Sequence, residues 1–257
     1  MKYIILSLIL AFELVASVVK SPIVSLDAKN DIVTIEIDKI DVGMSGFIVH
    51  SITPEHSVIL KNVVVTSFDT ATKVATLSMS DYDALRNNAL PNGRWSVEVG
   101  DMVVLAFGYS RGLLISPDVE IYDRIVRSAK HIQWVHPDIF ATILSFNGHP
   151  TPLREDFTKF SNASSVGVIF IYLNKKVFTI DAKSFKILSI TDAQLKQSNT
   201  QLPFYTRVQE IDANWWGAGS DPLESYEPHY YKLLTEANPD NELLKKLVNK
   251  YNTKASE

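Results

Sequence analysis

The chain has 257 residues and no cysteine, and its hydrophobic (46%) and charged (21%) fractions are those of an ordinary globular protein. This composition excludes a disordered chain and a disulfide scaffold, and the missing thiols exclude Cys-ligated zinc, iron–sulfur clusters and thiolate chemistry. With 25 Lys and Arg against 29 Asp and Glu, the formal net charge is −4. A mildly acidic chain has no overall field for holding DNA or RNA, so we expect no nucleic-acid partner.

The N-terminus predicts export. Lys2 is followed by an apolar run that starts at Tyr3, and this run is shorter than the about 20 residues needed to span a bilayer. Val15-Ala16-Ser17 suits the small-residue rule for signal-peptide cleavage. We therefore predict a signal peptide over residues 1–17 and a mature chain that starts near Val18, with an N-terminal membrane anchor as the alternative. No later stretch is long and apolar enough to span, so we expect no membrane span in the mature chain.

Residues 18–116 have the pattern of a β-rich unit. Apolar residues alternate with polar ones over Ile32–Ile37, and the turn signal before them predicts a hairpin with Pro22–Leu26. Further strands are expected at Gly46–His50, Ser57–Val65, Val74–Met79, Met102–Tyr109 and Leu113–Ile115. Short strands at fairly regular spacing predict a small barrel or sandwich, with one short helix at Asp81–Asn88.

Residues 117–191 change to a helical period and then back to strands. Three helices are expected to start at Ser116-Pro117, Pro137-Asp138 and Thr151-Pro152, where proline suits the first turn. The second should end at Asn147-Gly148. Three strands follow, at Val166–Leu173, Val177–Asp181 and Phe185–Ile190. Helices followed by strands predict a smaller α+β unit and not a βαβ sheet.

Residues 192–257 form a tail in which the order weakens. One helix is expected after Asn238-Pro239-Asp240, with an apolar stripe of Leu243, Leu244, Leu247 and Tyr251. The predicted fold class is therefore α+β: a barrel- or sandwich-like N-terminal unit, a smaller helix-then-strand unit and a C-terminal helix.

The residues that could form a metal or acid–base site are His131, His136, Asp138, His149 and Asp156. No pair among them has the fixed short spacing of a His-Glu-x-x-His motif. The simpler interpretation makes His136 a helix cap, His149-Pro150 a turn and Asp156 part of a solvated helix start. We therefore predict no catalytic residue, no metal site and no cofactor. An enzyme built around His136, Asp138 and His149 is the third hypothesis for function.

Trp215 and Trp216 stand next to each other in a Gly-rich segment. Such a pair can form an exposed binding surface. Because large aromatic residues are mostly buried, we expect instead that the pair fills the seam between the tail and the folded body.

A family resemblance is carried by motifs that occur in order along the chain. They are Ser45–His50, His56–Ile59, Gly100–Val103, Tyr109–Pro117, His136–Ala141, Gly148–Pro152 and Phe204–Val208. Over residues 20–231 the chain resembles the N-terminal domain of the plasminogen-binding surface proteins of Gram-negative bacteria. The resemblance implies a non-enzymatic, exported protein of the cell surface, outer membrane or periplasm, whose partner would be plasminogen or another host protein.

One departure from this family concerns lysines. Members that bind plasminogen carry a long Lys-rich C-terminal extension, and a lysine near the terminus suits a kringle lysine pocket. Here the sequence ends Lys254-Ala255-Ser256-Glu257 after one short helix. We therefore predict that Lys246, Lys250 and Lys254 are the contact cations, offered to acidic, aromatic-lined pockets. The alternative is a periplasmic or envelope assembly or docking factor with no host ligand, which docks through its β unit.

Overall fold

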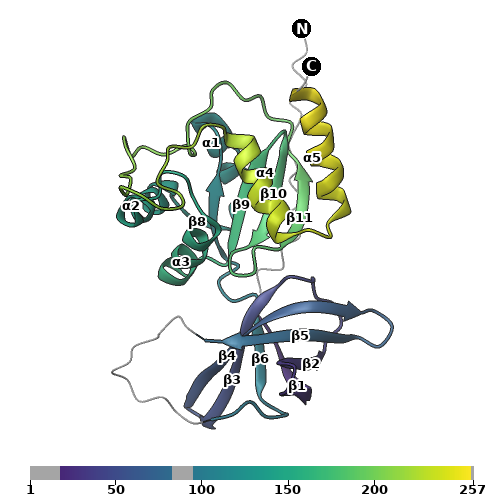
Figure 1. Ribbon diagram of the computed structural model, residues 1–257. Helices are drawn as coiled ribbons and strands as arrows, with labels where there is room; N and C mark the ends of the chain where they lie inside the picture. The colour runs from purple at the N-terminus through teal and green to yellow at the C-terminus, as the bar shows by residue number, and fades with distance from the viewer. Residues whose placement is uncertain (1–17, 83–94, 256–257) are drawn as a thin grey trace. The chain divides into compact units, whose positions relative to one another are not determined.

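The computed structural model describes residues 18–82 and 95–255, with side chains to Tyr251. The described chain divides into two compact units, which meet in sequence between Tyr109 and Ser110 (Figure 1). The predicted signal peptide lies outside the described residues, and so does most of the helix predicted at Asp81–Asn88. Within the described ranges, no helix has both the length and the apolar character that crossing a membrane requires.

The first unit is a closed antiparallel barrel with strand order β1-β2-β5-β4-β3-β6. The strands are β1 (Val19–Asp27), β2 (Ile32–Glu36), β3 (Ser45–Thr53), β4 (His56–Asp69), β5 (Val74–Asp81) and β6 (Met102–Leu105). The predicted hairpin is confirmed, because β1 and β2 pair with Leu26 opposite Val33. Alternate side chains fill the interior, among them the fully buried Val33, Ile35 and Leu77. The β-rich, barrel-like N-terminal unit is thus confirmed.

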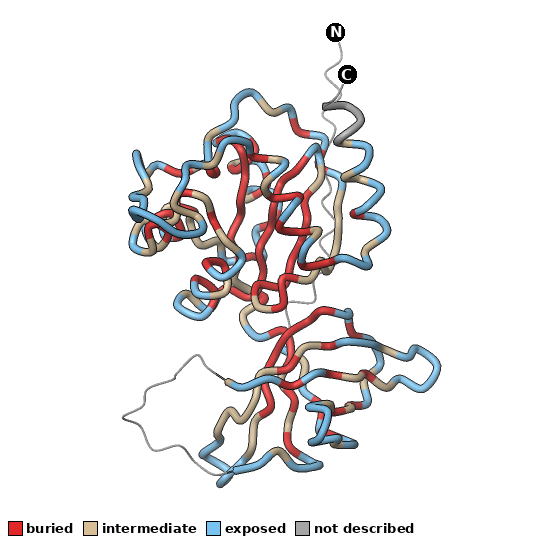
Figure 2. Tube along the Cα trace, in the orientation of Figure 1, coloured by how far each residue is buried: buried red, intermediate tan, exposed pale blue. Residues whose placement is uncertain are grey.

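The second unit is a mixed five-stranded sheet with helices packed on it, in strand order β11-β10-β9-β7-β8. The strands are β7 (Arg111–Ile115), β8 (Gln133–Val135), β9 (Val168–Leu173), β10 (Lys176–Asp181) and β11 (Ile187–Asp192). The helices are α1 (Val119–Ser128), α2 (Pro137–Asn147), α3 (Arg154–Ser164), α4 (Tyr226–Ala237) and α5 (Glu242–Ala255). All six residues of the central strand β9 are buried, and this part of the tube is red in Figure 2, so both faces of the sheet are covered at its centre. The α+β class is confirmed.

Strand β7 differs from its prediction. The sequence pattern assigned it to the barrel, but in the structure it runs parallel to both β8 and β9 in the second sheet. Its Leu113-Leu114-Ile115 run is completely buried, which is typical of a central parallel strand. Because α1 connects β7 to β8, these three elements form a βαβ crossover. The expectation that this unit contains no βαβ element was therefore wrong at this point.

The two ends of helix α2 are as predicted. Gly148 ends α2 in the left-handed conformation, and the His136 side chain accepts a hydrogen bond from the Asp138 N–H at its start. The other two predicted starts were wrong. Helix α1 is capped by Asp118, whose carboxylate accepts the Ile121 N–H at 2.8 Å, and not by Ser116. Helix α3 begins at Arg154, after Leu153, and not at Thr151-Pro152.

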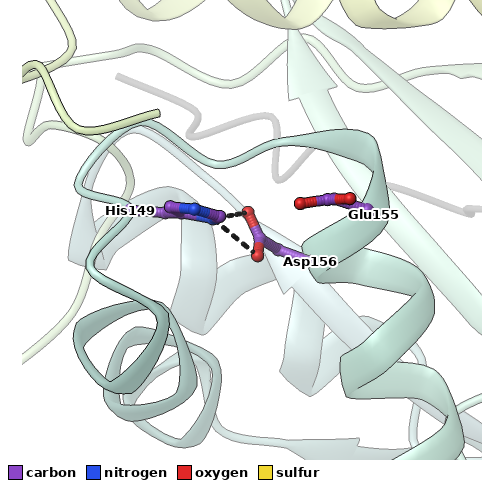
Figure 3. Close-up of side chains that lie close together, drawn as sticks. All are labelled: His149, Glu155 and Asp156. Carbon is purple, nitrogen blue, oxygen red and sulfur yellow. Dashed lines mark hydrogen bonds and ion pairs between the residues drawn. The ribbon is translucent and has the colours of Figure 1, made fainter. Parts of the chain in front are cut away.

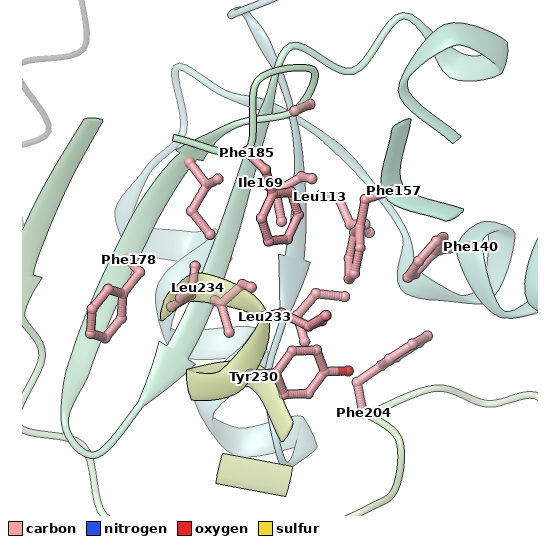
Figure 4. Packing of buried hydrophobic residues seen from close by; sticks show 14 of the residues in the cluster. Leu113, Phe140, Phe157, Ile169, Phe178, Phe185, Phe204, Tyr230, Leu233 and Leu234 are labelled. Carbon is pink, nitrogen blue, oxygen red and sulfur yellow. The ribbon is translucent and has the colours of Figure 1, made fainter. Parts of the chain in front are cut away.

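An aromatic cluster holds α2 and α3 on the sheet. The Phe140 ring lies 4.6 Å from Phe157, 5.1 Å from Phe160 and 5.5 Å from Phe204, measured between ring centroids, and all four residues are fully buried. Figure 4 shows the side chains of Phe140, Phe157 and Phe204. Phe204 lies in residues 192–257, for which the sequence pattern predicts a weakly ordered tail, and yet it is buried. The segment after β11 therefore belongs to the core of this unit.

Helix α4 was not predicted, and it covers the same sheet. The buried Tyr226 hydroxyl donates to the carbonyl oxygens of Ile115 and Tyr172, at 3.1 Å each. One turn later, the Tyr230 hydroxyl donates to the Pro203 carbonyl at 2.9 Å. Burial raises the pKa of both phenols far above its ordinary value, so they remain neutral donors. Helix α4 thereby provides the platform on which α5 lies.

Candidate functional site

Helix α5 docks by one apolar stripe. It starts after Asn241, whose side chain accepts the Leu244 N–H at 2.9 Å. Leu244 is fully buried, and Leu247, Val248 and Tyr251 are partly buried against the core of the second unit. This stripe fixes which face of α5 points to water.

Leu243 was predicted to belong to that stripe, and this was wrong. It is 54% exposed, and Val248 takes its place against the core. The Tyr251 ring lies 5.3 Å from the Tyr231 ring of α4, which sets the rotation of the helix.

The described lysine side chains of α5 lie on the remaining surface. Lys246 and Lys250 are exposed and stand four residues apart, so they share one face of the helix. Lys254 continues the same spacing along the α5 backbone, but its side chain lies outside the described residues. Lys245 is different, because its ammonium group lies 2.8 Å from the Glu242 carboxylate. That hydrogen bond raises the pKa of Lys245. We call Lys246, Lys250 and Lys254 the lysine face.

A second group of polar side chains lies where α2 turns into α3. The His149 Nδ1 lies 2.9 Å from each oxygen of the Asp156 carboxylate (Figure 3). Asp156 also accepts the Asn147 side-chain amide at 3.0 Å and the Leu153 N–H at 2.9 Å. Asp156 is fully buried, so the expectation of a solvated helix start was wrong. The carboxylate is a buried acceptor that ties the turn together.

Glu155 completes a set of three groups that could hold a cation. The ligand atoms of His149, Glu155 and Asp156 all lie within 4.8 Å of one another. Both oxygens of Asp156, however, already accept hydrogen bonds from protein donors, and Glu155 lies 3.5 Å from the Lys159 ammonium. A cation here would have to displace at least one of these donors.

His136 and Asp138 belong to a different network, at the other end of α2. Asp138 accepts hydrogen bonds from the Arg207 guanidinium at 2.7 Å and from the Thr206 hydroxyl at 2.8 Å. The His136 ring lies 5.2 Å from the Tyr122 ring, and burial lowers the pKa of this imidazole. Helix α2 has 11 residues, which separates the two histidines by about 16 Å. His136, Asp138 and His149 therefore do not form one acid–base site, and His131 lies in the loop before β8.

Trp215 and Trp216 are exposed, at 94% and 81% respectively. The expectation that they fill a seam was therefore wrong. The loop that carries them is held on the α2–α3 turn by backbone hydrogen bonds, from the Asn214 N–H to the Gly148 carbonyl and from the Thr151 N–H to the Gly219 carbonyl.

Comparison with known proteins gives one consistent result. Residues 18–234 match the family described as "Plasminogen-binding protein pgbA N-terminal". Two curated relatives from Helicobacter pylori, strains J99 and 26695, are each named "Plasminogen-binding protein PgbA" and are 26% identical over 222 residues. The match covers 85% of this chain but 48% and 47% of those relatives, so the chain spans about half their length. No solved structure matches the chain significantly. The family match covers most of the chain, and the chain therefore belongs to the family of the plasminogen-binding protein pgbA N-terminal domain.

Proposed function

We propose that this chain is an exported, non-enzymatic protein of the cell envelope or surface, and that it binds a host protein such as plasminogen through the lysine face of α5. The observation that carries the proposal is the geometry of α5. Its apolar stripe packs against the core of the second unit, and Lys246 and Lys250 remain exposed on one face. Solvated ammonium groups at this spacing can enter acidic, aromatic-lined pockets on a partner.

The names of the relatives support the choice of partner. Both Helicobacter pylori proteins are named for plasminogen binding. The family match ends at residue 234, before α5 begins at Glu242. The lysine face is therefore proposed from this chain's own geometry and not transferred from the relatives.

Export is proposed from the N-terminal sequence. The apolar run and the small residues up to Ser17 predict cleavage near that position. The family match begins at residue 18 and β1 begins at Val19, which is consistent with a mature domain that starts there. N-terminal sequencing of the protein from its native cell should find Val18 or a neighbouring residue first. An intact Met1 chain as the main form would contradict export.

Binding is tested with immobilised plasminogen and the purified mature chain. We expect saturable binding that weakens as salt is added and that a free lysine analogue competes away. Replacing Lys246, Lys250 and Lys254 by Ala should reduce the affinity at least tenfold. Unchanged affinity in this triple variant would mean that α5 is only a packing element.

A matched control separates the lysine face from net charge. Lys29, Lys39 and Lys130 are also exposed, and replacing all three by Ala changes the charge by the same amount elsewhere on the chain. This control variant should bind plasminogen as the unmodified protein does. An equal loss in both triple variants would indicate non-specific electrostatic attraction and would contradict the proposed site.

A second candidate function is an envelope docking factor with no host ligand. The exposed tryptophan pair favours it, because such a surface is typical of protein–protein contacts. This docking surface lies in the second unit, in place of the β unit that the sequence suggested. Proteolysis of intact cells tests the distinction. A chain that is cleaved by added protease reaches the outer surface and can meet host proteins, whereas complete protection would favour the docking factor.

A further inference from the structure

The segment 212–221, which we call the tryptophan loop, is fixed at both ends and yet exposes its two largest side chains. At its start, the Asp212 N–H donates to the Ser145 hydroxyl at 2.9 Å, and this hydroxyl donates to the Asp212 carboxylate at 2.8 Å. At its end, the Thr151 hydroxyl donates to the Asp221 carbonyl at 2.6 Å. The loop is therefore held by defined hydrogen bonds on both sides of Trp215.

Close backbone packing fixes the middle of the loop. The Asn214 N–H donates to the Gly148 carbonyl at 3.0 Å, and the Asn214 side chain donates to the Asn147 carbonyl at 2.6 Å. Gly148 has φ +70°, and a Cβ atom there would overlap the Asn214 side chain. Gly219 has φ +84°, and its Cβ would lie 2.9 Å from the Thr151 carbonyl oxygen. Only glycine suits these two positions.

The exposed rings therefore have no role in holding the loop. Trp215 and Trp216 follow directly after the anchored Asn214 and remain 94% and 81% exposed. Phe146, on the neighbouring end of α2, is 91% exposed. Large aromatic residues are the side chains that most often dominate binding at protein interfaces. A loop that is ordered before binding loses little conformational entropy when a partner docks.

The charge around the rings indicates the kind of partner. Residues 208–231 contain five acidic residues and no Lys or Arg, and residues 137–153 contain no Lys or Arg either. Four of the acidic residues are exposed, namely Glu210, Asp212, Asp221 and Glu224. Exposed indole rings in a segment whose charged residues are all acidic complement cationic side chains, because a guanidinium or ammonium group can stack on an indole ring while carboxylates neutralise its charge. The same carboxylates repel an anionic lipid surface.

We infer that the tryptophan loop is a docking surface for a protein segment that carries Arg or Lys side chains. This surface is distinct from the lysine face of α5, which has the opposite charge and is held by other contacts. The inference does not depend on plasminogen binding.

The inference is tested with fluorescently labelled peptides and the full mature chain. The probe is a capped ten-residue peptide with three arginines among glycine and serine, and its matched control has citrulline, which is neutral and of similar shape, in place of each arginine. We expect saturable binding of the arginine peptide, measured by fluorescence anisotropy, and at least tenfold weaker binding of the citrulline peptide. Affinity for the arginine peptide should fall as salt is added.

Variants of the chain assign the binding to the loop. Trp215→Ala with Trp216→Ala should weaken binding of the arginine peptide at least tenfold. Asp221→Asn with Glu224→Gln should weaken it severalfold and reduce its salt dependence. Trp95→Ala is the matched control, because Trp95 is 47% exposed but belongs to the barrel unit, and it should leave the affinity unchanged. Because Trp215 and Trp216 are exposed, we expect the thermal midpoint of their double variant to match that of the unmodified chain.

Several results would overturn the inference. One is no saturable binding of the arginine peptide, and another is binding that the double tryptophan variant retains. Equal affinity for the citrulline peptide would exclude the role of cations. Tryptophan-dependent sedimentation with phosphatidylcholine vesicles would assign the loop to a membrane surface, and a tryptophan-dependent dimer in light scattering would assign it to a second copy of the chain.

Discussion

The docking of α5 gives a sharp test, because two neighbouring leucines have opposite environments. Leu244 is fully buried, whereas Leu243 is 54% exposed. Replacing a buried leucine by alanine costs about 2–5 kcal/mol, whereas an exposed position changes stability by about 0.5 kcal/mol or less. The two substitutions change helix propensity equally. The expected difference between them is therefore the contribution of Leu244 to holding α5 on the rest of the unit.

Amide hydrogen exchange over Glu242–Tyr251 measures this difference. A 14-residue helix is only marginally stable alone, since isolated helices shorter than about 12–15 residues scarcely form in water. Undocking of α5 should therefore also unfold it. A loss of about 2 kcal/mol corresponds to about thirtyfold less protection in Leu244→Ala, with little change in Leu243→Ala. Equal protection in the two variants would refute the docking stripe.

Three further perturbations test the contacts around the α2–α3 turn. Asp156→Ala removes the buried acceptor of three donors and should lower the free energy of unfolding in urea by about 3 kcal/mol or more; a loss below about 1 kcal/mol would contradict the network. Gly148→Ala introduces a Cβ that overlaps Asn214, so the Asn214 amide should exchange faster, and unchanged exchange would count against the close packing. Burial lowers the pKa of His229, whose Nε2–H donates to the Pro152 carbonyl at 2.9 Å. The fold therefore favours the neutral imidazole. The contribution of His229 to the free energy of unfolding should be fully present above the ordinary pKa of 6.5 and decrease as the pH drops below it. In urea titrations at several pH values, the decrease in the free energy of unfolding at low pH should be smaller in His229→Gln. An identical pH dependence in this variant would refute the role of His229.

Local sequence patterns predicted the elements whose ends and buried faces are set by neighbouring residues. The hairpin of β1 and β2 follows from alternation and a turn signal, and α2 follows from its proline start and its glycine end. Strand β7 was placed in the wrong unit because a short apolar run does not reveal its neighbours. Its pairing with β9 joins segments more than 50 residues apart, and no local rule encodes that contact.

Helix α4 was missed because tyrosines provide much of its buried face. Tyr226 and Tyr230 are four residues apart, which is a helical spacing, but Pro228 interrupts the pattern between them. Their buried hydroxyl groups donate to the carbonyl oxygens of Ile115 and Pro203. These acceptors are distant in the sequence, so no local pattern indicates that the tyrosines are buried. A pattern of purely apolar residues therefore does not reveal the buried face of this helix.

The candidate sites, too, could be predicted only where local sequence determines which side chains are exposed. The sequence predicted Lys246 and Lys250 as contact cations, and the structure has both of them exposed on α5. The exposure of Trp215 was not predicted, since a general preference for burial says nothing about a particular loop. The available signal was the pair of glycines that follows the tryptophans, Gly217 and Gly219, in a segment without basic residues.

The lysine face and the tryptophan loop should act independently, because different contacts hold them. The stripe centred on Leu244 holds α5, whereas the α2–α3 turn at Gly148 holds the loop. Variants at separate sites with no shared partner have additive effects. Leu244→Ala should therefore weaken plasminogen binding and leave the arginine peptide bound, and Gly148→Ala should do the reverse. If either variant weakened both kinds of binding, the two surfaces would be parts of one site.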